Sequence, residues 1–324
     1  MGSPARRIGL GMLLIPLGLV PVMPAPASAQ APQYITQWGT SGSGNGQFDH
    51  PVGVAVNAAG EVFVADKGNH RIQKFSGTGV FLMQWDLPGG DGYFDLPEGL
   101  ATNAAGDLYV GDAGLHRIQR FSGTGAFIDE WYGSADPAFG WYLPVKEPRG
   151  LAIGANGEVY VADAGNGYVQ KFTGGGGHLV DRWVGGVPSG IAVDAAGNAY
   201  VTWDNTVRTF TSGLTYLTQW GSAGSGEGQF NIPRGVAVDA AGNVYVADTD
   251  NHRIQEFTNT GNYVAQWGSE GSGDGQFSYP WGVATDAAGY IYVADTNNNR
   301  IQKFGHLPTP TKPTTWGRLK RTYR

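Results

Sequence analysis

Cysteine is absent from all 324 residues of this chain. Its absence excludes disulfides, thiol catalysis, zinc–cysteine sites and iron–sulfur clusters. Charged residues are also scarce, at 15%, and no segment shows a convincing helical pattern. The fold must therefore be held by its core, and 41% hydrophobic and 12% aromatic residues are sufficient to build one.

A hydrophobic run long enough to cross a bilayer is lacking as well. The longest run, residues 8–22, has 15 residues and two prolines, whereas a spanning helix needs about 20 apolar residues. It follows two arginines and precedes the small-residue motif Ala-Ser-Ala at 27–29. This pattern is typical of a secretory signal over residues 1–29, and an uncleaved anchor is the alternative. We expect the mature chain to begin near Gln30 and to be secreted, periplasmic or on the cell surface.

The net charge of −6 is unevenly distributed along the chain. Residues 30–305 hold 14 basic and 27 acidic residues, a net charge of −13, while residues 306–324 hold five basic residues and no acidic one. An acidic surface opposes nucleic-acid binding, which requires neutralisation of phosphates, so we expect no nucleic-acid partner. The tail 306–324 is predicted to be a Pro/Thr-rich linker with a basic end. It is either a docking segment or a disordered terminus.

What the chain does contain is a phrase of about 46 residues repeated six times, with 53 glycines concentrated at its turns. A period in this range with about four short strands per unit is typical of a β-propeller blade. We therefore predict an all-β fold: one six-bladed propeller of four-stranded antiparallel blades over residues 30–305. The six Gly-Val-Ala-Val-like segments are 40 to 51 residues apart and begin at Gly53, Gly99, Gly150, Gly190, Gly235 and Gly282.

The last copy of the repeat is incomplete. Five copies end in a fourth strand that finishes with Trp, but the sixth copy stops at Phe304. The missing strand is matched by Tyr-Ile-Thr-Gln-Trp at 34–38. We predict that this N-terminal strand completes the last blade, which removes an open sheet edge that would favour aggregation.

Four sub-motifs recur in fixed order: Gly-Gln-Phe, Pro-x-Gly-Val-Ala-Val-Asp, Tyr-Val-Ala-Asp and Asn-His-Arg-Ile-Gln. In this combination the chain resembles the NHL-repeat family from Tyr34 to Phe304, and the resemblance implies a six-bladed propeller. The third copy departs from the motif, with Gly167-Tyr168 in place of His-Arg. The fourth has Trp203 and Thr206 in place of the usual Asp and Arg.

Two repeated positions carry charged or metal-binding side chains. Equivalent histidines of different blades are separated by the radius of the propeller, far beyond a metal–nitrogen bond of about 2 Å, so we expect no metal site. Asp–Arg pairs five residues apart are predicted to close the loop between two strands, because one ligand rarely needs the same group from every blade. These pairs are Asp66 and Arg71, Asp112 and Arg117, Asp248 and Arg253, and Asp295 and Arg300.

One position varies from copy to copy inside the repetitive frame, directly after the proline that begins the first strand. A variable position on a regular scaffold is where a specific binding surface is written, although tolerated surface residues are the alternative. Two arginines suit a carboxylate, sulfate or phosphate, and a tryptophan suits a sugar or a peptide side chain. The residues at this position are Val52, Glu98, Arg149, Ser189, Arg234 and Trp281, and all but Val52 are our candidate ligand-binding residues.

From these observations we expect a secreted, monomeric binding propeller that recognises a peptide, protein or glycan at the mouth of its central channel, without a cofactor. The alternative is a metal-assisted lyase or hydrolase that uses the channel. The fold resembles that of peptidyl-hydroxyglycine amidating lyase and streptogramin lyase, which use histidines and a metal near the channel. The mouth of this chain shows no such histidine set, so no catalytic residue is assigned. We predict that the Gly/Ser-rich loops at 39–46, 221–228 and 268–275 are flexible connections rather than phosphate-binding loops.

Overall fold

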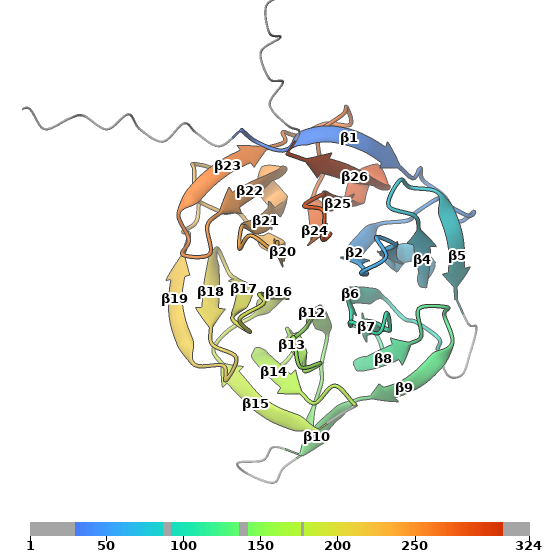
Figure 1. Ribbon diagram of the computed structural model, residues 1–324, viewed down its shortest axis with the longest axis vertical. Helices are drawn as coiled ribbons and strands as arrows, with labels where there is room; N and C mark the ends of the chain where they lie inside the picture. Colours follow the sequence, from blue (N-terminus) through green and yellow to red (C-terminus); the bar gives the residue numbers. More distant parts are fainter. Residues whose placement is uncertain (1–29, 87–91, 136–141, 176–177, 307–324) are drawn as a thin grey trace, which may run out of the picture.

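Six small antiparallel sheets surround a central axis in the computed structural model of the chain, seen along that axis in Figure 1. The structure describes residues 30–86, 92–135, 142–175 and 178–306. The expected signal, 1–29, and the tail from 307 onward lie outside the described residues. Each of the six sheets has four strands, which confirms the predicted six-bladed propeller.

The blades follow one another in chain order, with the first strand of each nearest the axis. Blade 1 contains β2 (Pro51–Val56), β3 (Val62–Asp66), β4 (Arg71–Phe75) and β5 (Phe81–Trp85). Blade 2 contains β6 (Pro97–Thr102), β7 (Leu108–Asp112), β8 (Arg117–Phe121) and β9 (Phe127–Trp131). Blade 3 contains β12 (Pro148–Ile153), β13 (Val159–Asp163), β14 (Tyr168–Phe172) and β15 (Leu179–Val184).

The second half of the chain repeats the pattern. Blade 4 contains β16 (Pro188–Val193), β17 (Ala199–Trp203), β18 (Thr206–Phe210) and β19 (Tyr216–Trp220). Blade 5 contains β20 (Pro233–Val238), β21 (Val244–Asp248), β22 (Arg253–Phe257) and β23 (Tyr263–Trp267). Blade 6 contains β24 (Pro280–Thr285), β25 (Ile291–Asp295), β26 (Arg300–Gly305) and β1 (Gln33–Trp38).

The ring is closed by the first strand of the chain. β1 pairs antiparallel with β26, with Tyr34 opposite Phe304 and Trp38 opposite Ile301. The predicted closure is therefore confirmed. In Figure 1 the blue β1 lies on the rim beside the red β26, so the two ends of the ring meet in one blade.

Aromatic side chains pack each blade against the next. The Trp that ends each outer strand lies against the Phe that ends the third strand of the following blade. Trp38 is 5.9 Å from Phe75, and Trp267 is 5.7 Å from Phe304, measured between ring centroids. The second strands, rich in Val, Tyr and Ala, are buried along their whole length. The core is thus a ring of wedges between blades, in which each blade completes the core of its neighbour.

A ring of six glycines allows the inner strands to converge on the axis. They are the glycines at the start of the Gly-Val-Ala-Val-like segments, and they line a narrow axial cavity. A Cβ atom on Gly53 would lie 1.9 Å from the carbonyl oxygen of Glu98, and one on Gly282 would lie 2.2 Å from that of Val52. Real Cβ atoms do not approach backbone so closely, so these positions require glycine for close packing.

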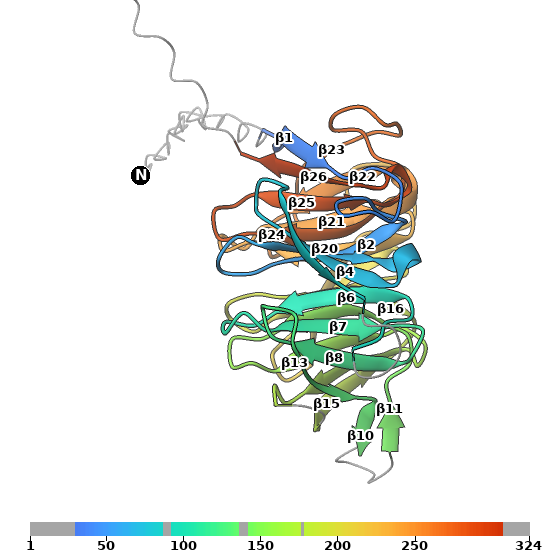
Figure 2. The same ribbon diagram turned by 90° about the vertical axis from the view of Figure 1, so that its right-hand side faces the viewer.

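The spacing of 51 residues between the second and third segments reflects an inserted ribbon that the sequence did not predict. β10 (Gly133–Ala135) pairs with β11 (Tyr142–Pro144) and projects from the edge of the disc in Figure 2. Helical structure in the described ranges is limited to three single turns of 3-10 helix: η1 (Lys67–Asn69), η2 (Thr249–Asn251) and η3 (Thr296–Asn298). No helix among the described residues has the length and hydropathy needed to span a membrane.

A candidate ligand site at the mouth of the channel

The six variable positions meet around the axis, as their equivalent places in the repeat require. Each is the second residue of an inner strand, and together they line a cavity of about 80 Å³ with the six axial glycines. The structure therefore brings together all five candidate ligand-binding residues and Val52 on one rim. The residues are Val52, Glu98, Arg149, Ser189, Arg234 and Trp281.

A wider cleft of about 370 Å³ opens above this cavity over blades 5, 6 and 1. The two spaces share Val52, Arg234 and Trp281. Leu96 and Tyr279 add apolar surface, while Lys67 and Asp250 add charge. The volume lies within the range of about 300–1,000 Å³ that is usual for small-ligand pockets.

The cationic side of the site is built on Trp281. The guanidinium of Arg234 lies 4.4 Å from the centroid of the Trp281 ring, and the ammonium of Lys67 lies 5.5 Å from it. Both contacts fall within the cation–π range of about 6 Å. Burial, together with repulsion from Arg149, lowers the pKa of the Arg234 guanidinium, which nevertheless remains charged at neutral pH.

The acidic side of the site is Glu98, which is only 6% exposed. Its Oε1 accepts a hydrogen bond of 2.6 Å from Lys67 Nζ, which reaches across from the neighbouring blade. Its Oε2 is buried and has no hydrogen-bond partner among the described residues. The pair places one negative and one positive charge between the narrow cavity and the cleft.

Arg149 and Ser189 line the other side of the mouth. Arg149 forms an ion pair of 3.1 Å with Glu147, the residue two positions before it. With Arg234 they also line a third cavity of about 280 Å³ between blades 3, 4 and 5. Arg149 is thus already paired, whereas Arg234 forms no hydrogen bond or ion pair through its side chain with the rest of the described chain.

The Asp–Arg pairs lie outside the cavity, in the loops that support it. In blade 5, Arg253 Nε donates to Asp248 at 2.7 Å, and the same distance is found for Arg71–Asp66 and Arg300–Asp295. All six residues are buried. These three pairs join the second and third strands of their blades at the loop end.

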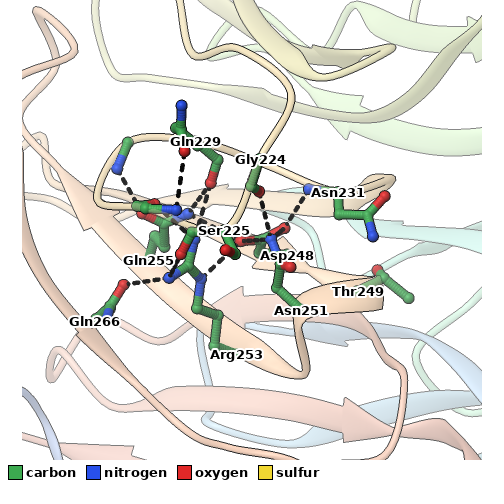
Figure 3. A network of polar contacts seen from close by, with 12 residues as sticks. Gly224, Ser225, Gln229, Asn231, Asp248, Thr249, Asn251, Arg253, Gln255 and Gln266 are labelled. Carbon is green, nitrogen blue, oxygen red and sulfur yellow. Dashed lines mark hydrogen bonds and ion pairs between the residues drawn. The ribbon is translucent and has the colours of Figure 1, made fainter.

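The arginine does more than close this loop, as Figure 3 shows for blade 5. Arg253 also donates to the carbonyl oxygens of Ser225, Gly226 and Gln229 at 2.7 to 3.0 Å. Ser225 and Gly226 belong to the Gly/Ser-rich loop 221–228 before the blade, and Gln229 follows that loop directly. Arg71 and Arg300 hold the loops at 39–46 and 268–275 in the same way. The prediction of flexible connections missed these bonds, because nothing in the loop sequence itself identifies the arginine that orders it.

Blades 2, 3 and 4 depart from this network to different degrees. In blade 2, Arg117 Nε lies 3.8 Å from Asp112 and turns its terminal nitrogens to Glu130 and to the Tyr93 carbonyl oxygen. Burial raises the pKa of Asp112 to about 6. The backbone donors of Asp95 and Leu115 and the charge of Arg117 offset only part of this effect. Blade 3 keeps Asp163, and blade 4 has neither the Asp nor the Arg.

The repeated histidines have a role that sequence reasoning did not find. His70, His116 and His252 adopt the left-handed conformation and accept, through Nδ1, a backbone N–H from the following blade at 3.1 to 3.4 Å. Asn299 in blade 6 and Asn205 in blade 4 accept the equivalent bond through Oδ1. The exchange of His for Asn was the available signal, because both side chains offer an acceptor and Asn tolerates this backbone conformation.

No group of three or more His, Cys, Asp or Glu residues that could hold a metal occurs in the part of the chain that the structure describes. The groups gathered at the mouth are instead two guanidinium groups, one ammonium, one indole and two carboxylates, of which that of Glu98 is buried and that of Asp250 lines the cleft. This set suits recognition of an anionic group next to an apolar or aromatic body.

Comparisons with known proteins agree with this architecture. The NHL repeat family matches residues 48–75, 94–121, 146–172, 230–257 and 277–304. B-box type zinc finger protein ncl-1 of Caenorhabditis elegans is 49% identical over 51 residues, which cover 16% of this chain and 6% of that protein. The chain therefore spans only a small part of this relative.

Solved structures share the fold at low sequence identity. A streptogramin B lyase structure has a TM-score of 0.60 and 17% identity, over 86% of this chain and 99% of that one. Virginiamycin B lyase from Staphylococcus aureus has a TM-score of 0.56 and 14% identity, over 84% and 95% of the two chains. The chain is therefore a six-bladed β-propeller of the NHL-repeat type, with five of its blades matched as NHL repeats.

Proposed function

We propose that this protein is a non-enzymatic binding propeller that recognises a peptide, protein or glycan ligand at the mouth of its channel. The observation that carries the proposal is the convergence of the six variable residues on one rim beside a cleft of about 370 Å³. At the mouth, one position of the repeat varies from blade to blade, and two buried polar atoms, Arg234 Nε and Glu98 Oε2, have no partner among the described residues.

The chemistry of the mouth supports ligand binding by charge and stacking. Arg234 offers a planar guanidinium that is held against Trp281 and unpaired with any described residue, and such a group prefers a carboxylate or phosphate. The similar lyase structures keep channel-based catalysis as the alternative function. That alternative has no residue set at this mouth to support it, so we place binding first.

A comparison of single variants against peptide and glycan arrays tests this proposal. Arg149→Ala, Arg234→Ala and Trp281→Ala should each lose the ligands that the unchanged protein binds. Lys146→Ala is the matched control, because Lys146 is an exposed cation on the same face, outside the three mouth cavities. Ligands retained in full by all three mouth variants would remove this face from consideration.

We also propose that residues 1–29 direct export, which would place the propeller outside the cytoplasm. The support is the order of two arginines, an apolar run and a small-residue motif in the sequence. N-terminal sequencing of the protein recovered from culture medium or periplasm should give Gln30 as the first residue. Recovery of the protein only in the cytoplasm, with its first 29 residues retained, would contradict the proposal.

A further inference from the structure

Two buried polar atoms at the channel mouth have no hydrogen-bond partner among the described residues. They are Nε of Arg234, a donor, and Oε2 of Glu98, an acceptor. A buried polar group without a partner destabilises the fold, so such atoms are normally satisfied by a ligand or an ordered water. Both residues line the cavity of about 80 Å³.

The two residues belong to opposite sides of the ring. Glu98 lies on β6 of blade 2 and Arg234 lies on β20 of blade 5, three blades away in a ring of six. The cavity between them has room for a small polar group, given that one water takes about 30 Å³ of liquid volume. A group that bridges them must offer an anion on one side and a donor on the other.

Two other cations at the mouth are already paired, and Asp250, which lines the cleft, adds a negative charge. Lys67 is bound to Oε1 of Glu98, and Arg149 is bound to Glu147. Arg234 is therefore the cation left for an external anion, and Oε2 of Glu98 is the acceptor left for an external donor. The guanidinium lies 4.4 Å from the centroid of the Trp281 ring, and this contact restricts the side chain, so less freedom is lost when it binds a carboxylate.

The cleft next to this pair has apolar side chains as well as the charges already described. Val52, Trp281, Leu96 and Tyr279 all line the cleft of about 370 Å³, which shares Val52, Arg234 and Trp281 with the cavity. Contact between an aromatic ring and an indole or phenol is favourable beyond the burial of apolar area alone. An aromatic side chain of a ligand thus has a place within reach of the polar pair.

We propose that the mouth binds a small carboxylic acid that carries a hydrogen-bond donor on the carbon next to the carboxylate and an aromatic side chain. This inference rests on the proposed function and names its ligand chemistry. The carboxylate binds Arg234, the neighbouring hydroxyl or ammonium donates to Oε2 of Glu98, and the ring lies in the cleft beside Trp281. Aromatic hydroxy acids and aromatic amino acids share this chemistry.

Titration calorimetry of the full chain with four matched compounds tests the inference. L-phenyllactate carries the acid, a hydroxyl donor and the ring; L-phenylalanine carries an ammonium donor instead of the hydroxyl. 3-Phenylpropionate lacks the donor, and L-phenylalaninamide lacks the carboxylate. We expect at least one of the first two to bind, 3-phenylpropionate to bind about 10-fold more weakly than that compound, and the amide to lose binding about 30-fold or more. Tighter binding of phenyllactate or of phenylalanine identifies the donor as hydroxyl or ammonium.

Two variants connect these differences to the residues. Arg234→Gln should abolish the preference for acid over amide, and Glu98→Gln should reduce the preference for phenyllactate over phenylpropionate. Lys146→Ala should bind all four compounds as the unchanged protein does, and thermal unfolding should show that the variants remain folded. Equal affinities for acid and amide, or equal affinities for 3-phenylpropionate and the tighter binder of phenyllactate and phenylalanine, would overturn the inference, as would the absence of binding by all four compounds. The array experiment judges mouth binding independently of these outcomes.

Discussion

Blades 1, 5 and 6 differ from blades 2, 3 and 4 in how their loops are held at the mouth. In the first group a buried arginine pairs with its Asp at 2.7 Å and also binds three carbonyl oxygens of the preceding loop. In the second group this pair is stretched, incomplete or absent. The wide cleft lies over blades 5, 6 and 1. The regular half of the ring thus supports the cleft with loops that are held by buried arginines, and its residues that vary from blade to blade line the cleft above them.

The largest predicted effect comes from removing the buried arginine whose hydrogen bonds distinguish blades 1, 5 and 6 from blades 2, 3 and 4. Arg253→Leu should destabilise the propeller by about 3–5 kcal/mol, because it leaves the Asp248 carboxylate buried and frees the loop at 221–228. Thr206→Ala changes the equivalent position of blade 4, where Thr206 donates only to the Trp203 carbonyl oxygen, and should cost about 1 kcal/mol. Urea unfolding of both variants measures the difference. Similar losses in the two blades would show that the arginine network does not distinguish them.

A smaller effect compares two axial glycines. Gly53→Ala should cost about 3 kcal/mol, because its Cβ would lie 1.9 Å from a backbone oxygen that cannot move without shifting blade 2. At Gly99 the nearest atoms would be 3.1 Å away, so Gly99→Ala should cost about 1 kcal/mol. Thermal unfolding of the two variants provides the measurement. A Gly99 variant as unstable as the Gly53 variant would mean that clearance at the axis does not set the cost.

The smallest effect concerns Glu256 in blade 5, the fourth residue of the third strand of that blade. Lys74, Lys171 and Lys303 each donate to a turn carbonyl of the next blade, but blade 5 has Glu256 at this place. In blade 6, which follows, the third and fourth strands are β26 and β1, the two ends of the ring, so no turn joins them. Glu256 instead lies 3.7 Å from His306. Burial and the nearby Asp239 raise the pKa of Glu256 to about 7.

This shift gives Glu256→Gln a defined pH dependence. A folded-state pKa above the unfolded value means that the folded protein binds more protons, so the contribution of Glu256 to stability is lost as pH rises toward 7. The variant should match the unchanged protein near pH 4.5 and exceed its stability by about 1–3 kcal/mol at pH 8.5. Unfolding free energies across this range provide the test. A difference that does not change with pH would contradict the assignment.

Glu61→Gln in blade 1 is the control of opposite sign. Although burial raises the pKa of Glu61, hydrogen bonds from Lys74 and Asn57 lower it overall. Its stabilising contribution is therefore present above the unfolded pKa and is lost on acidification. The variant should be slightly less stable than the unchanged protein at neutral pH, with the difference disappearing in acid.

The repeat made most of the fold predictable, because each blade states the same pattern of strands and turns. Closure by β1 followed from the missing fourth strand after Phe304, and the grouping of the mouth residues followed from their fixed offset from the proline. The ribbon of β10 and β11 was not predicted, because it belongs to no repeat.

Contacts between blades were beyond sequence reasoning. The stacking of Arg234 on Trp281 joins residues 47 positions apart, and the Lys67–Glu98 pair joins residues 31 positions apart. Both depend on which side chains become neighbours once adjacent blades pack around the axis. The histidine acceptors were missed for the same reason, since their partners are backbone groups of the next blade.

The pairing of Gln33 with Gly305 determines where the propeller can be attached to another molecule. Both ends of the folded ring leave from a single point on its circumference, far from the axis. A tether, a tag or a neighbouring domain attached at either end would be joined to the propeller at its rim. Both flat faces of the propeller, including the mouth of the channel, would then remain accessible to ligands.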